Sequence, residues 1–177
     1  MGERGFGMNL SRHTYDRERV RQYAERWWND YHPKFKKFEV DCTNFVSQCL
    51  LAGGFPMQGG ERRDEGWWYR GNGGEDDNWS YSWAVAHSLH WYLAGGRTPI
   101  PVWEVQRPQE LAIGDVVCYD WSGGGKWEHT TIVTGHGADG MPLVNAHTVN
   151  SRHRLWSYRD SHAWTPQSRY KFFHIDD

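Results

Sequence analysis

The chain has 177 residues, a formal net charge of −2 and a sequence pI of about 6.5. A chain of this length can bury a sizeable hydrophobic core, so we expect one domain over residues 1–177. The near-neutral charge argues against nucleic acid as a partner, and no apolar run approaches the roughly 18 residues of a membrane span.

The N-terminal part of the chain predicts one helix and no leader. Residues Met1 to Leu10 contain no apolar segment of the kind found in signal peptides. As given, the sequence therefore predicts a cytoplasmic protein; removal of a leader would instead place it outside the cell or at the cell wall. From Tyr15 to Tyr31, large apolar side chains recur at intervals of three and four residues, which predicts a helix that Pro33 ends.

The segment from Asp41 to Gly54 places a cysteine at the start of a second, short amphipathic helix. Asp41 is a favourable N-cap residue, and the glycine pair Gly53–Gly54 is a helix stop. A thiol at a helix N-terminus meets the positive end of the helix dipole and unpaired N–H groups, which stabilise its nucleophilic thiolate form. The apolar face lies three, four, seven and eight residues after Cys42 and consists of Phe45, Val46, Cys49 and Leu50.

The cysteine count argues against a disulfide-stapled fold. There are three cysteines, an odd number without a compact framework of spacings. Cys42 and Cys49 lie roughly 10 Å apart along the predicted helix, too far to bridge. Cys118 lies in a predicted strand and is expected in the core. Cys42 is therefore the candidate nucleophile.

The rest of the sequence predicts that helices come first along the chain and the strands of an antiparallel sheet follow, which is an α+β arrangement. Residues 53–79 are rich in glycine and polar residues and are expected to form a long loop. A third helix is expected from Trp83 to Leu93 and an extended segment from Pro99 to Pro108. The expected strands are Val116 to Tyr119, His129 to Thr134, Pro142 to His147 and Tyr170 to Ile175.

Aromatic content is unusually high, with 12 Trp, 9 Tyr and 7 Phe. These side chains either fill the core or line a groove that stacks on sugar rings or grips a peptide. Aromatic residues in the long loop favour a groove wall at that place, and the loop before His129, Asp120 to Trp127, is expected at its rim. The candidate substrate-binding residues are Asp41, Trp67, Trp68, Tyr69, Trp83, Trp127 and His147.

A nucleophilic cysteine needs a base and a polar group that orients the base. His129 opens a β-branched run, and a histidine at the start of a central strand can face a helix N-terminus across the sheet. In the following strand, a period of two places Asn145 and His147 on one face. If the two strands pair as a hairpin, one of these side chains lies within reach of His129.

These segments occur in the order found in a known family: residues 15–17 and 23–24, 41–50, 81–83, 111–116, 129–134 and 145–148. The chain resembles the putative amidase domain family, a branch of the papain-like cysteine hydrolases related to the NlpC-type and CHAP cell-wall hydrolases. The resemblance implies a papain-like fold, with N-terminal helices packed on an antiparallel sheet. It also implies amide hydrolysis through Cys42 as nucleophile, His129 as base and Asn145 as orienting residue, with His147 as the alternative to Asn145.

Several alternatives remain open at this point. Peptidoglycan peptides are the first expected substrate, a cytoplasmic amidase that trims peptides in a biosynthetic pathway is the rival, and acyl transfer to an amine is compatible with the same site. An inactive module could instead bind a glycan or peptide through its aromatic residues. Metal binding would need closer ligand pairs than the cysteines offer, although His87 and His90 lie three apart, so neither metal nor another cofactor is expected. The oligomeric state is not predicted.

Overall fold

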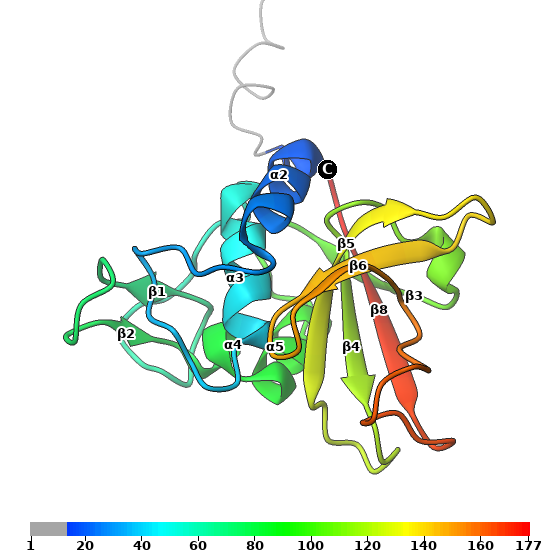
Figure 1. Ribbon diagram of the computed structural model, residues 1–177. Helices are drawn as coiled ribbons and strands as arrows, with labels where there is room; N and C mark the ends of the chain where they lie inside the picture. The colour runs from blue at the N-terminus through cyan, green and yellow to red at the C-terminus, as the bar shows by residue number, and fades with distance from the viewer. Residues whose placement is uncertain (1–13) are drawn as a thin grey trace, which may run out of the picture.

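The computed structural model describes residues 14–177, so the expectation about Met1 to Leu10 lies outside the described residues. The helices gather on one side of a six-stranded sheet, and a small two-stranded ribbon lies on their far side (Figure 1). The helices are α2 (Arg17–Trp27), α3 (Cys42–Ala52), α4 (Tyr81–Ala84) and α5 (Ala86–Ala94), with a short 3-10 helix, η1 (Pro108–Glu110). The strands are β1 (Tyr69–Arg70), β2 (Asn78–Trp79), β3 (Val102–Val105), β4 (Val116–Asp120), β5 (His129–His136), β6 (Pro142–Ala146), β7 (Ser151–Leu155) and β8 (Arg169–Ile175).

The large sheet has the strand order β3-β8-β4-β5-β6-β7, and every neighbouring pair is antiparallel. This mixture of helices and antiparallel strands is consistent with the predicted α+β class. The four predicted strands are present, with ends that differ by at most two residues from those expected. Strand β7 was not predicted, because four of its five residues are polar and lack an alternating apolar pattern, as is typical of a strand at a sheet edge.

The helices differ from their predictions at their ends. The first is shorter than expected and begins after Asp16, whose carboxylate caps it by accepting the N–H of Arg19 at 3.1 Å. Asp41 occupies the N-cap position of α3 as predicted, but its carboxylate makes no capping hydrogen bond there. The predicted helix from Trp83 to Leu93 is two helices, because Val85 between them is extended (φ −118°, ψ 122°).

Helix α3 was predicted to be amphipathic, with one buried face, but in the structure it is a central helix that is buried on all sides. Every side chain from Cys42 to Leu50 is buried, because α2, α4 and α5 pack around it and the sheet covers its remaining side. The helix-facing side of the sheet contributes Val116, Cys118 and Ile132 to the larger core. The opposite face has a second, smaller core that contains Val117, Tyr119, Val133, Val144 and Phe172. The parity of a residue within its strand therefore decides which core its side chain joins.

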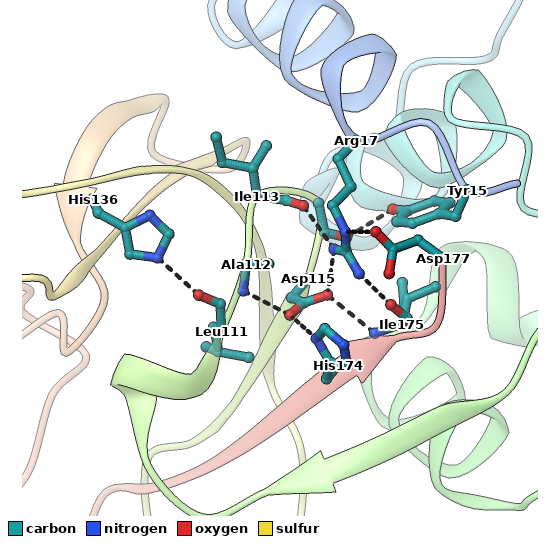
Figure 2. Close-up of polar contacts among 11 residues, drawn as sticks. Tyr15, Arg17, Leu111, Ala112, Ile113, Asp115, His136, His174, Ile175 and Asp177 are labelled. Atoms are coloured by element: carbon teal, nitrogen blue, oxygen red, sulfur yellow. Dashed lines mark hydrogen bonds and ion pairs between the residues drawn. The ribbon is translucent and has the colours of Figure 1, made fainter.

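A polar cluster fastens the first helix to the sheet. Asp115 is fully buried, and its carboxylate accepts hydrogen bonds from Arg17 Nη1 at 2.8 Å and from the backbone N–H groups of Ala112 at 2.8 Å and Ile175 at 3.0 Å. His174 Nδ1 lies 2.7 Å from the same carboxylate. Figure 2 shows that these contacts converge on Asp115 from α2, from the turn before β4 and from the end of β8.

Candidate active site

Cys42 and His129 line one cavity of about 470 Å³. Cys42 is the first residue of α3 and His129 is the first residue of β5, so two elements that are distant in sequence present their starting residues to the same space. The cavity is completed by the turn after β6, by β7 and by the loop before β8. Its other lining residues are Val40, Trp121, Glu128, Thr148, Val149, Arg154, Tyr158 and Asp160 to Ala163.

The Cys42 side chain is buried, with only 2% of its surface exposed. Burial raises the pKa of its thiol, while contacts with Thr43, Thr130 and Thr148 lower it without reversing the shift. The sequence analysis expected the helix N-terminus to favour the thiolate, but desolvation is the larger effect here. Cys42 therefore needs a base to become a nucleophile.

His129 is also buried, at the end of the smaller core. Its ring lies 5.2 Å from the ring of Tyr119 and 5.0 Å from that of Tyr158, measured between centroids. Burial, followed by the charge of Arg154, lowers the pKa of His129 to about 3. The imidazole is consequently neutral at physiological pH, which is the form required of a general base. Within residues 14–177, no hydrogen-bond partner is present for its buried Nε2 atom.

The predicted hairpin of β5 and β6 is present, but its register separates Asn145 from His129. Asn145 pairs with Ile132, so its side chain lies on the helix-facing side of the sheet, whereas His129 has the opposite parity. The Asn145 amide is occupied there. Its oxygen accepts from Thr134 Oγ1 and the His153 N–H, both at 2.9 Å, and its nitrogen donates to the Ala24 carbonyl at 3.2 Å.

His147 and Asp41 contact each other and do not contact His129. The Nδ1 atom of His147 lies 2.6 Å from Asp41 Oδ2, and its Nε2 lies 2.6 Å from the Trp27 carbonyl. A carbonyl oxygen only accepts, so Nε2 carries a proton. The other carboxylate oxygen of Asp41 accepts the Phe38 N–H and the Asn44 side-chain amide. These two buried residues thus tie the start of α3 to the end of β6, and neither lines the cavity.

The other residues expected to bind substrate lie in the helical half of the molecule. Trp67 and Trp83 are fully buried in the larger core, where their indole N–H groups donate to Ser47 and Asn44. None of the five lies at the cavity: Trp67, Trp68, Tyr69, Trp83 and Trp127 are all buried elsewhere. The aromatic wall of the cavity comes from Trp121, which lies in the loop expected at the rim, and from Tyr158 and His162.

The residues that β7 and the loop after it contribute to the cavity were not predicted from the sequence; they are Arg154, Tyr158 and Asp160 to Ala163. One signal was available: residues 156–168 form a long segment between strands, and long ordered loops are frequently functional. In the described part of the chain three non-glycine residues have a positive φ, and two of them line the cavity: Thr148 (88°) and Tyr158 (57°). Such strained backbone is concentrated at functional sites.

Neither a metal site nor a membrane span is found in residues 14–177. No three His, Cys, Asp or Glu side chains in this range are grouped so that they could hold a metal ion. No helix in the same range is long and apolar enough to cross a bilayer. His90 stacks on Trp127, with ring centroids 4.2 Å apart, and belongs to the buried aromatic layer.

Comparisons with known proteins connect the chain to one family. The sequence model of the family described as "Putative amidase domain" matches residues 14–173, which include all the elements described above except the last residues of β8. The chain is 50% identical over 163 residues to the uncharacterized protein YhbB of Bacillus subtilis strain 168. The match covers 92% of this chain and 51% of that protein, so the chain spans about half the length of its relative. No solved structure matches the chain significantly.

Proposed function

Because the chain belongs to the putative amidase domain family, we propose that it is a cysteine-dependent amide hydrolase of papain-like fold. The observation that carries the proposal is the cavity that Cys42 and His129 share at the N-terminus of α3. A thiol at the first residue of a helix and a neutral imidazole both line this cavity, and acyl transfer to a cysteine requires a thiol, a base and donors for the oxyanion. The family supports amide chemistry, and the cavity supports the choice of nucleophile and base.

The proposed reaction has two stages. His129 accepts the Sγ proton of Cys42 as the sulfur attacks the amide carbonyl, and the N–H of Cys42 stabilises the oxyanion that forms. The imidazolium then protonates the leaving nitrogen, the C–N bond breaks, and a thioester remains on Cys42. In the second stage His129 takes a proton from water, the hydroxide oxygen attacks the thioester, and the thiol and a carboxylic acid are released. An amine in place of water would give acyl transfer.

The proposed first stage relies on a proton transfer and not on a preformed ion pair. Burial raises the pKa of Cys42 and lowers that of His129, so both groups are held in their neutral forms. The thiol therefore becomes nucleophilic only as its proton moves to the imidazole. General-base assistance of this kind contributes about 10²- to 10⁴-fold to a rate.

For the substrate, we propose peptidoglycan peptides as the first class to test, following the resemblance to cell-wall hydrolases. A peptide amide from a biosynthetic pathway fits the same chemistry and serves as the second class. The alternative is an inactive module that binds a glycan or peptide in an aromatic groove. Trp67, Trp68, Tyr69, Trp83 and Trp127 are buried away from the cavity, but Trp121 and Tyr158 still give the cavity an aromatic wall.

The first experiment is iodoacetamide labelling of Cys42, located by mass spectrometry, between about pH 5 and pH 9. We expect the wild type to label at a nearly constant rate across this range, because His129 stays neutral throughout and assists the thiol. In His129→Ala the rate should fall by at least about 10²-fold at neutral pH and rise about tenfold per pH unit. His136→Ala is the matched control, since this histidine lies at the far end of the same strand and contacts the Leu111 carbonyl.

A labelling rate that does not depend on His129 would remove the base from the mechanism. The complementary experiment incubates the protein with muropeptides and with synthetic peptides and measures the amines released. Cys42→Ala should release none while retaining the thermal stability of the wild type. Turnover by Cys42→Ala would refute the assignment of the nucleophile.

A further inference from the structure

Two of the unpartnered polar atoms in the described part of the chain lie on neighbouring rings beside the cavity. Among buried side chains of residues 14–177, only four nitrogen or oxygen atoms lack a hydrogen-bond partner. Two belong to His90, and the others are His129 Nε2 and the hydroxyl oxygen of Tyr158. The His129 and Tyr158 rings have centroids 5.0 Å apart and an interplanar angle of 54°. Because buried polar groups are nearly always paired, this pair of neighbours requires an explanation.

The Tyr158 ring is held firmly where it lies. The Arg154 guanidinium carbon is 3.9 Å from the ring centroid, and the Tyr119 ring is 5.0 Å away on another side. Only 3% of Tyr158 is exposed, yet it lines the same cavity as Cys42. Its backbone adopts φ 57°, which is unfavourable for a bulky residue and persists only where surrounding contacts impose it.

No other residue considered for the orienting role is free to bond His129. Asn145 and His147 lie on the opposite face of the sheet and are fully bonded there. The Tyr119 hydroxyl, also next to His129, donates to the Trp156 carbonyl at 2.6 Å and lies 3.0 Å from Thr131 Oγ1, so it already has two partners. The Tyr158 hydroxyl makes no hydrogen bond of normal geometry within the described residues. Burial raises its pKa, and the nearby Ser151 and Arg154 side chains oppose that shift, but its oxygen can still accept a hydrogen bond from His129.

We propose that Tyr158 is the positioning residue of the site, with its hydroxyl oxygen accepting the Nε2–H of His129. This inference rests on the proposed function, because it gives His129 a defined tautomer for its role as base. With the Nε2 proton held by the phenol oxygen, Nδ1 is the nitrogen that receives the Cys42 proton and later returns it. No electrons are transferred, and the Tyr158 hydroxyl keeps its own proton throughout, since a hydroxyl accepts and donates at the same time.

The distance between the two rings is compatible with this role. Hydrogen bonds at catalytic sites are frequently long before substrate binds and shorten in the substrate complex. The two polar atoms are not bonded to each other in the structure, so the proposed hydrogen bond requires the neighbouring His129 ring to turn toward the Tyr158 hydroxyl when substrate binds. Since Nε2 is enclosed, His129 can meet a reactant in the cavity only through the edge of its ring that carries Nδ1.

The test compares Cys42 labelling by iodoacetamide in the wild type, Tyr158→Phe and Tyr170→Phe. Tyr158→Phe removes one oxygen atom, and we expect the labelling rate at neutral pH to fall by at least about tenfold, with an upper limit near the 10⁴-fold loss seen when a triad loses its orienting group. The labelling profile of this variant should also acquire the pH dependence of His129→Ala. Tyr170→Phe is the control, because it also removes a single phenol oxygen, but one that lies outside the cavity and already donates to the Ser157 carbonyl at 2.6 Å. Its labelling rate should match that of the wild type.

A spectroscopic readout keeps the test valid even if Tyr158→Phe folds poorly. In the wild type, the ¹⁵N shifts of the His129 ring should show a proton on Nε2 and none on Nδ1. The reverse tautomer in the wild type, or labelling of a folded Tyr158→Phe at the wild-type rate, would overturn the inference. Either result would leave the proposed function intact, provided that His129→Ala still slows labelling; if His129→Ala has no effect, the proposed function itself fails.

Discussion

Acidification should destabilise the fold through His90, which is buried without a partner for either ring nitrogen. Burial is the main cause that lowers the pKa of His90 from 6.5 to about 4; Lys171 and His87 act in the same direction, and Glu104 opposes them. In the unfolded chain the imidazole binds a proton below about pH 6.5, whereas in the folded protein it does so only below about pH 4. Stability is therefore complete above the unfolded pKa and is lost progressively as the pH falls toward the folded pKa.

The magnitude follows from the difference between the two pKa values. One pKa unit corresponds to about 1.4 kcal/mol, so a difference of about 2.5 units gives a ceiling of about 3 kcal/mol below pH 4. At pH 5 the unfolded state is nearly fully protonated and the folded state is not. His90 should then account for a loss of about 2 kcal/mol in the free energy of unfolding relative to pH 7, and His129, whose pKa burial lowers to about 3, adds to the total loss in the wild type.

The assay is urea unfolding at pH 7 and pH 5 for the wild type, His90→Phe and His162→Gln. Phenylalanine preserves the stacking on Trp127 but does not titrate, so His90→Phe should lose about 2 kcal/mol less than the wild type between the two pH values. His162 is exposed, so the control should keep the pH dependence of the wild type. If His90→Phe loses as much stability as the wild type, the imidazole is solvated or paired in solution and the reasoning is refuted.

Three further substitutions test the fold and the site. Asp115→Ala should lower the free energy of unfolding by about 3–5 kcal/mol, measured in urea, because it leaves the partners of a buried carboxylate uncompensated. Asn145→Ala should lower it by about 1–3 kcal/mol yet leave the rate of Cys42 labelling within about twofold of wild type; a large loss of labelling would return Asn145 to the catalytic set. Gly53→Ala should lower the melting temperature, because its new Cβ would lie 2.3 Å from Val20 Cγ2, at a destabilisation of about 1–3 kcal/mol. At Gly135 an added Cβ meets no atom within 4 Å, so Gly135→Ala should not lower the melting temperature through a clash. Equal effects at the two glycines would contradict the packing argument.

The sequence predicted the elements whose side-chain pattern matches their geometry. The spacing of apolar residues located α3 and placed Cys42 at its first turn, and the β-branched run after His129 located β5. A central helix buried on all sides was not predictable, since polar residues such as Asn44 and Gln48 are also enclosed there. The break between α4 and α5 was missed because Val85 carries no signal of the kind that glycine or proline gives.

For the candidate site, the sequence indicated the cysteine and the histidine but not their surroundings. The alternation of side chains along a strand was used correctly for Asn145 and His147, but the register against His129 depends on the turn and the bulge between β5 and β6. A shift of one residue in this register moves a side chain to the other face of the sheet, and no pattern in the sequence specified the register. Tyr158 was missed because its position depends on a strained backbone in a loop, and such strain leaves no periodicity to detect.

The position of β8 has a consequence for how the sheet assembles. Strand β8, residues 169–175, lies between β3 and β4 in the sheet. β3 is therefore connected to β4 only through its pairing with β8. Pairings between strands so distant in sequence make closure slow, because the loop entropy is lost before the contacts form. During synthesis the helices are made before β5 and β6, the strands on which α2 and α3 pack. The sheet-facing apolar side of these helices therefore stays exposed until β5 and β6 have formed. Without residues 169–175, β3 would lose its partner strand and β4 one of its two partners, so β3 should join the sheet of the described residues only once β8 has formed.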